Sequence, residues 1–502
     1  MSEPGAVGAP RWLRATVVVL AALTIAIGWG SRLSWGLWLD ETFVAWQAEA
    51  GWSIARDKLG DPAQSVLFGY IEALFYFPGS PHMEAWLRVP ALIGGVVSCW
   101  LAGRLAERLA GAGTAPLAFV AMVGSSQMVV FSTQARPYTC AVAACLASLW
   151  GLVRWLETRR RRHGAAFAIG LALAVHLHLL FATFAVVPAF YLWQRARSGH
   201  RVDWRGLLGW LGLTAALLLP LIPLLRRMSR GVDPSAIGLQ SLGEALGELI
   251  PGTVLLSLVA FVFLLVPNRR IAGSAVRAAL DRAPLGLAAF WLLVPPLLLL
   301  AASHLTHRTL FLDRYFVHTV AAQALIVALL FRGFPATPRT LVLMACLFTT
   351  PILYGIRTWS QAETVVSWRP PFRAIRRLDP PGAAPVFVQS GHPPSNAADW
   401  QHGIERRMFF YSQVVAYPVP NHVYPLPYDL DAAMQSYVAR LADTELANAP
   451  LIFVTGLPRN VTVEWMRGFF EARGYVATYP LHEDGFWLLA LRRTTPGGGG
   501  PP

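Results

Sequence analysis

Long apolar segments, separated by short polar segments rich in Arg, run from residue 12 to residue 357. About 17 to 20 apolar residues in an α-helix are enough to cross a hydrocarbon core about 30 Å thick. The pattern predicts a mostly α fold, a polytopic transmembrane helical bundle of about eleven spans. The spans are expected at residues 12–30, 86–104, 114–131, 138–156, 165–179, 181–194, 207–225, 250–267, 285–303, 314–331 and 339–357.

The segment 165–194 decides the number of spans, because it could form two short helices or one long tilted helix. With a cytoplasmic N-terminus, the predicted inner segments hold roughly twice as many basic residues as the outer ones. The Arg-rich clusters at 159–162 and 195–205 both fall inside only if two spans separate them. The positive-inside rule therefore supports eleven spans. It places the loop 31–85 and everything from residue 358 onward outside the cytoplasm.

The first outer loop, residues 31–85, is longer and more patterned than a simple connection. The stretch WLDETFVAWQAEAGWSIARDKL predicts an amphipathic interfacial helix, with Trp38, Trp46 and Trp52 at its boundary with water. SVLFGYIEALFYF predicts a second such helix. Helices of this kind commonly form a lid or platform on a membrane surface, so residues 1–357 with this loop are expected to form one membrane domain.

The C-terminal part of the chain changes character, because short strand-like runs alternate with helical stretches between turns rich in Pro and Gly. The strand-like runs are residues 384–391, 450–457 and 486–493, and the helical stretches are residues 431–443 and 462–475. We predict a small α/β domain outside the cytoplasm, formed by residues 358–493. Residues 494–502, mostly Gly and Pro, can bury almost nothing and are expected to be disordered.

Composition agrees with a membrane protein. Of the 502 residues, 55% are hydrophobic and 14% are charged, and the mean hydropathy is +0.46. A soluble domain with an ordinary wetted surface does not show this balance. The net charge of +14 resides mainly in Arg clusters between apolar runs, which set topology and give no reason to expect a nucleic-acid partner. The chain is rich in Arg and nearly free of Lys, which favours a GC-rich bacterium and its inner (plasma) membrane.

Unusual polar groups gather at the predicted outer ends of the spans. Asp40 and Glu41 follow Trp38, and other candidates occur in FSTQARPYT at 131–139 and HLTHRTLFLDRYF at 304–316. The candidates are Asp40, Glu41, Arg88, Arg136, Tyr138, His176, His178, His304, Arg314 and Tyr315. The acidic pair could simply mark a helix re-entering water, and each Arg could anchor a lipid headgroup. Acids, His, Arg and Tyr at one membrane face are also what a site for an anionic, lipid-linked substrate needs.

Arg136 and Arg314 are the best-placed cations for the charge of a departing polyprenyl phosphate. Asp40 is available to orient an acceptor and accept its proton. His176 and His178 are two residues apart and cannot face the same way on a helix, which disfavours a shared metal site. His304 and His307 have a compatible spacing but do not complete a three-ligand site. The sequence assigns no metal, and a divalent cation is left open as a cofactor.

A family resemblance joins these motifs. The segments that carry it are Leu39-Asp40-Glu41, HMEAWLRVPALIGG at 82–95, FSTQARPYTCAVA at 131–143, HLHLLFA at 176–182 and Arg314-Tyr315. Their order and spacing resemble the glycosyltransferase family 39-like, or protein O-mannosyltransferase-like, proteins of the C-type glycosyltransferase superfamily. That superfamily includes the bacterial aminoarabinose transferase of lipid A. The resemblance covers residues 1–330.

The resemblance implies a transferase that takes a sugar from a polyprenyl-phosphate donor on the outer face of the membrane, with inversion at the anomeric carbon. Asp40 would be the catalytic carboxylate, and Glu41 its supporting neighbour. Donor phosphate binding falls to Arg88, Arg136, Tyr138, Arg314 and Tyr315, and His176, His178 and His304 would line the site. Many relatives carry His-Pro-Pro after an Asp, whereas this chain has DPAQSVLFGYI at 61–71. Asp61 and Tyr70 remain there as supporting residues.

The sequence therefore predicts a membrane hexosyl- or pentosyltransferase that uses a polyprenyl-phosphate sugar, with a membrane lipid environment and an undetermined lipid, protein or glycan acceptor. A lipid or solute transporter or flippase is the first alternative. It would need ionisable groups near the middle of the membrane and usually a repeat, and neither is found. A non-catalytic scaffold of the same fold is the second alternative, which the altered segment 61–71 leaves open.

Overall fold

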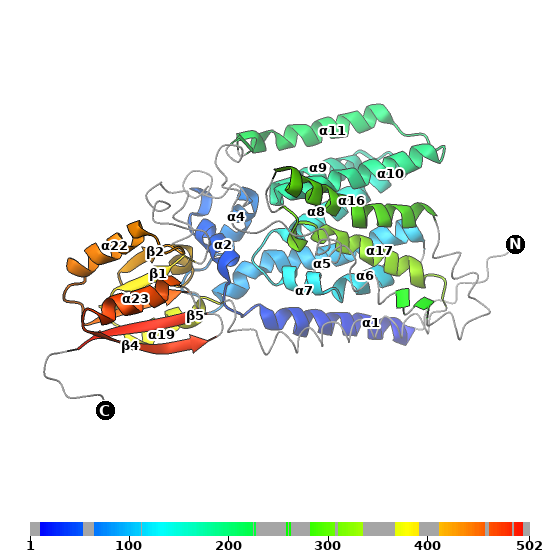
Figure 1. Cartoon of the computed structure of the whole chain (residues 1–502). Coiled ribbons are helices and arrows are strands. Elements are labelled where there is room, and N and C mark those ends of the chain that lie inside the picture. The colour runs from blue at the N-terminus through cyan, green and yellow to red at the C-terminus, as the bar shows by residue number, and fades with distance from the viewer. Residues whose placement is uncertain are drawn as a thin grey trace. The chain divides into compact units, whose positions relative to one another are not determined.

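The computed structural model describes residues 11–53, 65–111, 113–223, 225–226, 258–259, 261–262, 282–306, 310–334, 367–390, 411–456, 461–483 and 486–494. The chain divides into two compact units. The first unit contains residues 1–33, 62–68 and 88–357, and the second contains residues 34–61, 69–87 and 358–502. The fold is mostly α with a small C-terminal sheet, as the sequence predicted (Figure 1).

Apolar helices make up the described part of the first unit (Figure 1). A π-helical turn η1 (Thr24–Trp29) and a 3-10 turn η2 (Gly30–Arg32) continue its first helix, and η5 (Leu219–Leu221) follows its helix α11. The helices are α1 (Arg11–Leu23), α5 (Met83–Ala110, which starts in the second unit), α6 (Ala115–Val123), α7 (Ser126–Ser132), α8 (Tyr138–Thr158), α9 (Arg161–Leu177), α10 (Val186–Arg197), α11 (Trp204–Leu218), α16 (Arg282–Thr306) and α17 (Val320–Phe331).

Five helices among the described residues are long and apolar enough to cross a membrane, and the bent pair α6 and α7 would make a sixth. The two halves of this pair meet at 64°. The predicted spans 250–267 and 339–357 lie outside the described residues, apart from 258–259 and 261–262. The total of eleven spans therefore stays a prediction.

The segment 165–194 is not one continuous helix. Helix α9 ends at Leu177, and His178 is extended, with φ −157° and ψ 117°. A 3-10 segment, η4 (Leu179–Ala185), then leads into α10. The interruption at His178 is the structural basis for two separate helical segments here, the arrangement that the charge pattern favoured.

Small residues let α8 and α9 pack with their backbones close together. A Cβ atom on Gly170 would lie 2.8 Å from the backbone nitrogen of Ser148 and 2.9 Å from the carbonyl oxygen of Ala144. The hydroxyl of Ser148 donates a hydrogen bond to the carbonyl oxygen of Phe167 at 2.9 Å. Close approach through Gly and Ser is the usual way for helices to pack in a membrane, where lipid offers no hydrophobic drive between them.

The first outer loop belongs to the same compact unit as the C-terminal sheet. Its helix α2 (Leu39–Glu49) buries every residue from Glu41 to Ala45. A helix lying on a membrane surface would bury only one stripe, so the amphipathic pattern predicted for this helix is wrong in its described part. Packing against the C-terminal part of the same unit explains the difference: the hydroxyl of Thr42, for example, hydrogen-bonds the hydroxyl of Ser412 at 3.0 Å. The second predicted helix is present as α4 (Val66–Ala73).

A five-stranded mixed sheet with the order β2-β1-β3-β5-β4 forms the C-terminal part of the second unit. Its first three strands are parallel, and β5 is antiparallel to both β3 and β4. The elements are α19 (Arg369–Leu378), β1 (Val386–Gln389), β2 (Val423–Leu426), α22 (Ala432–Asp443), β3 (Leu451–Gly456), α23 (Val461–Glu471), β4 (Tyr475–Glu483) and β5 (Phe486–Arg493).

Helices cover this sheet. One core contains the buried side chains of α22 and α23, such as Met434 and Phe470, together with Phe387, Val454 and Leu489 from the strands. The strand residues that alternate with these are buried as well, and α19 packs against β4 and β5. A sheet buried on both faces explains why its central strands are continuous apolar runs.

Strands β1, β3 and β5 lie within the three predicted strand-like runs, whereas β2 and β4 were not predicted from the sequence. Both contain a proline, Pro425 in β2 and Pro480 in β4. Proline cannot donate a hydrogen bond to a neighbouring strand, so it argues against a central strand. Both strands occupy the edges of the sheet, and β4 has an irregular register between Thr478 and Leu481. Pro is tolerated at these places.

Replacement of Gly170 tests the packing of α8 against α9. We expect Gly170→Val to lower the free energy of unfolding by about 1 to 3 kcal/mol, because the added atoms meet backbone that no rotamer change can move. Gly209 in α11 is the matched control, since a Cβ atom there meets nothing within 4 Å. Thermal unfolding of both purified variants in detergent measures the effect. An equal melting temperature for the two variants would contradict this account.

Candidate functional site

The N-terminal turn of α2 carries the acidic pair. Trp38 precedes the helix in an extended conformation, and Asp40 and Glu41 lie in the first turn, where the helix dipole favours negative charge. The Glu41 carboxylate accepts a hydrogen bond from the backbone N–H of Trp38 at 3.3 Å, as in the second half of a capping box. Glu41 is 1% exposed, whereas Asp40 is half-buried. Glu41 thus caps the start of the helix, and Asp40 is the less buried of the two acids.

Glu72 in α4 is a third acid that the sequence reasoning missed. Its side chain is fully buried, and neither carboxylate oxygen has a hydrogen-bond partner within the described part of the chain. Burial raises the pKa of Glu72 well above its usual range, and the negative charge of Glu41 raises it further. The signal that could have found it is an isolated acid inside the apolar run VLFGYIEALFYF.

The supporting residues predicted from segment 61–71 are only partly described. Asp61 lies outside the described residues. The ring of Tyr70 stacks on Trp52 with centroids 5.8 Å apart, and Trp52 is exposed. Tyr70 therefore lies with an exposed aromatic residue near the end of α2.

Five of the predicted residues lie together in the first unit: Arg136, Tyr138, His178, Arg314 and Tyr315, called here the arginine cluster. The ring of His178 lies 5.3 Å from that of Tyr138 and 5.1 Å from that of Tyr315, measured between centroids. The guanidinium of Arg136 lies over the Tyr138 ring and donates a hydrogen bond to its hydroxyl at 3.2 Å. Arg314 lies over the Tyr315 ring. Residues from three distant segments thus meet in one place.

Interruptions of the helices position the arginine cluster. Arg136 lies in the turn before α8, which begins at Tyr138. His178 is the extended residue between α9 and η4, and Arg314 and Tyr315 lie in the 3-10 turn η6 (Asp313–Tyr315). Both guanidinium groups lie close enough to His178 to act on its charge. Two like charges at one place favour an anionic ligand between or beside them.

The other predicted residues have different partners or are exposed. Arg88 is buried, and its Nη1 atom donates hydrogen bonds to the carbonyl oxygens of Arg32 and Leu33 at 2.9 and 3.0 Å. The ring of His176 hydrogen-bonds the carbonyl oxygen of Leu217 at 2.8 Å, so it points away from His178, as their spacing indicated. His304 is exposed in the last turn of α16. Among the described residues, no three His, Cys, Asp or Glu side chains are grouped to hold a metal ion.

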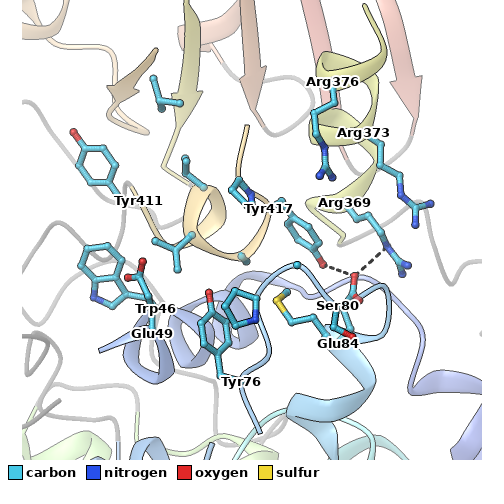
Figure 2. Close-up of a pocket in the computed structure, with 18 of the residues that line it drawn as sticks. Trp46, Glu49, Tyr76, Ser80, Glu84, Arg369, Arg373, Arg376, Tyr411 and Tyr417 are labelled. Atoms are coloured by element: carbon cyan, nitrogen blue, oxygen red, sulfur yellow. Dashed lines mark hydrogen bonds and ion pairs between the residues drawn. The ribbon is translucent and has the colours of Figure 1, made fainter. Parts of the chain in front are cut away.

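A large pocket lies within the second unit, with a volume of about 1150 Å³ (Figure 2). We call it the Arg-Tyr pocket. Figure 2 shows Arg369, Arg373 and Arg376 along one side, with Trp46 and Tyr411 toward the other. Its lining includes Trp46 and Glu49 from α2, Tyr76, Glu84 and five residues between them from the end of the first outer loop, the three arginines of α19, and Tyr411, Tyr417, His422, Tyr424 and Tyr437. The sequence reasoning did not find this pocket, since its walls come from three separate parts of the chain.

Solved structures of membrane glycosyltransferases resemble this chain. ArnT from Cupriavidus metallidurans in the apo state has a TM-score of 0.57 at 10% identity, over 95% of this chain and 98% of that one. ArnT bound to undecaprenyl phosphate has a TM-score of 0.58 at 12% identity and the same coverage. An Archaeoglobus fulgidus oligosaccharyltransferase tethered with an acceptor peptide has a TM-score of 0.51 at 13% identity, over 94% of this chain and 73% of that one.

The chain therefore shares the fold of these glycosyltransferases, and a fold of this kind is what the resemblance of its motifs implied. No family model matches the sequence, and no curated protein matches it either. With identities of 10 to 13%, these structures establish the fold of the chain and not its substrates.

The raised pKa of Glu72 predicts how stability depends on pH. A carboxyl group that ionises near pH 4.3 in the unfolded chain stays protonated to a higher pH in the folded protein. The free energy of unfolding therefore falls as the pH rises from about 4.3 toward the folded-state pKa. Glu72→Gln removes this pH-dependent loss of stability. The variant should therefore have a higher melting temperature than the wild type at about pH 8, and its melting temperature should change less between about pH 5 and pH 8.

Thermal unfolding in detergent across this pH range measures the difference. Glu107→Gln is the control, because Glu107 is an exposed acid in an ion pair with Arg104. Its melting temperature should depend on pH as that of the wild type does. If the melting temperatures of Glu72→Gln and the wild type change in parallel with pH, Glu72 does not have a raised pKa.

Proposed function

We propose that the chain is an integral-membrane glycosyltransferase that moves a sugar from a polyprenyl-phosphate donor to an acceptor on the outer face of the membrane. The arginine cluster, within a C-type glycosyltransferase fold, is the observation that carries this proposal. One of the structures with this fold is a complex with undecaprenyl phosphate, which supports a lipid-phosphate donor. The remaining steps follow from the chemistry of the residues.

The arginine cluster suits the leaving group. As the bond between the anomeric carbon and the phosphate oxygen breaks, the electron pair and its negative charge go to the polyprenyl phosphate. Arg136 and Arg314 offer guanidinium forks whose geometry matches phosphate oxygens. Their positions over Tyr138 and Tyr315 limit their movement, so little reorganisation is needed as the charge develops.

Asp40 suits the other half of the reaction. The acceptor hydroxyl attacks the anomeric carbon from the face opposite the phosphate, and its proton passes to the Asp40 carboxylate. Inversion at the anomeric carbon follows from this single displacement. Glu41 supports Asp40 by capping the helix that carries it. The sugar would be a hexose or a pentose.

The proposal includes a location. We place the enzyme in a bacterial inner membrane, with eleven spans and with residues 358–493 outside the cytoplasm, where a lipid-linked donor is used on the outer face. Several long, apolar helices support a multi-pass arrangement, and the Arg-rich clusters support the orientation.

Asp40→Asn tests the carboxylate. We expect a loss of transfer of about 10² to 10⁴-fold, because an amide cannot accept the acceptor's proton, while the variant stays folded in the membrane. The measurement is release of polyprenyl phosphate from a panel of radiolabelled polyprenyl-phosphate sugars, incubated with purified protein. Glu107→Gln, an exposed acid, is the matched control and should keep full activity. Undiminished transfer by Asp40→Asn would remove Asp40 from the mechanism.

Arg314→Gln tests the cation cluster. We expect kcat to fall by about 10² to 10³-fold, because the variant loses a charge that stabilises the departing phosphate. Inhibition by free polyprenyl phosphate should weaken as well, which reports binding without chemistry. Arg197→Gln is the control, since Arg197 lies over the Trp193 ring in another part of the chain. The role assigned to Arg314 fails if the variant is inhibited as strongly as the wild type and keeps its kcat.

A further inference from the structure

The Arg-Tyr pocket is large enough for a ligand of several rings. Sites for small ligands usually measure about 300 to 1,000 Å³, and this pocket has about 1150 Å³. All of its lining residues belong to the second unit. The donor phosphate residues proposed above belong to the first unit, so the pocket is a separate feature that the mechanism so far does not use.

One side of the pocket is basic. Arg369, Arg373 and Arg376 lie four and three residues apart in α19, on one helix face, and all three line the pocket (Figure 2). Phe372 and Ile375, on the other face, are buried. Arg373 and Arg376 are exposed, and within the described part of the chain neither forms an ion pair or hydrogen bond. Such a pair of guanidinium groups is suited to a carboxylate or phosphate.

The other side of the pocket is aromatic. Trp46 and Tyr76 line it together with Tyr411, Tyr424 and Tyr437. Rings of this kind combine an apolar face with a polar edge, which matches a sugar ring with its C–H faces and hydroxyl edges. Burial and the nearby charge of Glu49 raise the pKa of Tyr76 to about 12, so its hydroxyl remains a hydrogen-bond donor at neutral pH.

Acidic residues in the lining argue against a uniformly charged ligand. Glu49 lies beside Trp46, across the pocket from the arginines (Figure 2). Its carboxylate would repel a polyanion such as a nucleic acid but can accept hydrogen bonds from sugar hydroxyls. The ligand that fits is anionic where it meets α19 and rich in hydroxyl groups where it meets α2.

The floor of the pocket is fixed by a hydrogen-bond network. The Glu84 carboxylate lies 3.5 Å from the guanidinium of Arg369 and accepts a hydrogen bond from the Tyr417 hydroxyl at 3.4 Å (Figure 2). The Tyr417 hydroxyl accepts in turn from the backbone N–H of Leu37 at 2.6 Å. Because these groups are buried and mutually paired, the floor is preorganised and the ligand need not order it.

Helix α2 relates the pocket to the proposed catalytic carboxylate. Trp46 follows Asp40 by six residues in the same helix, which is about 9 Å along the helix axis at 1.5 Å per residue. A bound oligosaccharide could span that distance. This relation favours the acceptor over the donor as the occupant, because Asp40 is the group assigned to the acceptor's proton.

We propose that the Arg-Tyr pocket binds an anionic saccharide, with its carboxylate or phosphate group against Arg373 and Arg376 and a sugar ring against Trp46 and Tyr76. We infer that this saccharide is the acceptor of the transfer. The second statement rests on the proposed function, whereas the binding itself does not.

Binding is measured by calorimetry on the full chain in detergent, without any donor. The probes are a hyaluronan tetrasaccharide, which carries carboxylates, glucose 6-phosphate, neutral chitotetraose and inorganic phosphate. We expect at least one of the two anionic sugars to bind at least tenfold more tightly than both chitotetraose and inorganic phosphate. The stronger of the two identifies the carboxylate or the phosphate as the charged group. The proposal is overturned if the neutral and anionic sugars bind with equal affinity. It is also overturned if inorganic phosphate binds with the same affinity as the sugars.

Variants assign the binding to this pocket. The double variant Arg373→Gln/Arg376→Gln should lose at least tenfold in affinity for the anionic sugar and leave chitotetraose binding unchanged. Arg377→Gln is the matched control, because Arg377 is exposed in the same helix but does not line the pocket. Trp46→Leu should weaken the binding of both the anionic and the neutral sugar. Unchanged affinity of the double variant for the anionic sugar would contradict the proposal.

Asp40→Asn separates this inference from the proposed function. It should still bind the anionic sugar with the affinity of the wild type while it loses transfer. If transfer depends on Asp40 but no sugar binds in the pocket, the inference fails and the proposed function stands. If the sugar binds but Asp40→Asn keeps full transfer, the binding site stands and the catalytic assignment fails.

Discussion

The buried carboxylate of Glu84 links the first outer loop to the C-terminal part of the chain within the second unit. Glu84 is only 6% exposed, and a buried charge costs several kcal/mol unless it is paired and hydrogen-bonded. Its partners, Arg369 and Tyr417, come from parts of the chain about 300 residues away. Leu37 joins the same network through Tyr417. The first outer loop and the C-terminal part belong to one compact unit, and this pairing is one of the contacts between them. The same unit contains α2 and the walls of the Arg-Tyr pocket.

In the first unit, charged residues gather at helix interruptions, whereas in the second unit the buried Glu84 pairs with Arg369. The helices of the first unit pack through small residues and apolar side chains, and the arginine cluster lies where helical regularity is interrupted. Regular helices satisfy their own backbone groups, so interruptions are costly in an apolar surrounding unless side chains and neighbouring segments compensate. A cluster of Arg, Tyr and His at such interruptions is therefore the kind of feature that marks a functional site in a membrane protein.

Much of the candidate site was predictable from local sequence. Arg136, Tyr138, His178, Arg314 and Tyr315 were selected as polar residues at the ends of apolar runs, and the structure brings them together. Glu72 and the Arg-Tyr pocket were not predicted. Glu72 is an isolated acid within an apolar run, a signal that the sequence carries, but its burial is known only from the structure. The pocket needs side chains from segments whose pairing no local pattern encodes. The edge strands β2 and β4 were not predicted, because their prolines are more typical of turns than of strands.

The sequence by itself determined the class of protein. Hydrophobic length, charge asymmetry and ordered motifs are local or additive properties, so they predicted a helical membrane protein with the C-type glycosyltransferase fold and a small α/β part. Only the tertiary structure decided that α2 is buried, that Glu41 caps it while Asp40 is half-buried, and that α19 presents arginines to a pocket lined by the first outer loop. Those outcomes depend on which distant segments pair. A pairing such as that of Glu84 with Arg369 and Tyr417 involves side chains from both segments, so no single stretch of sequence records it.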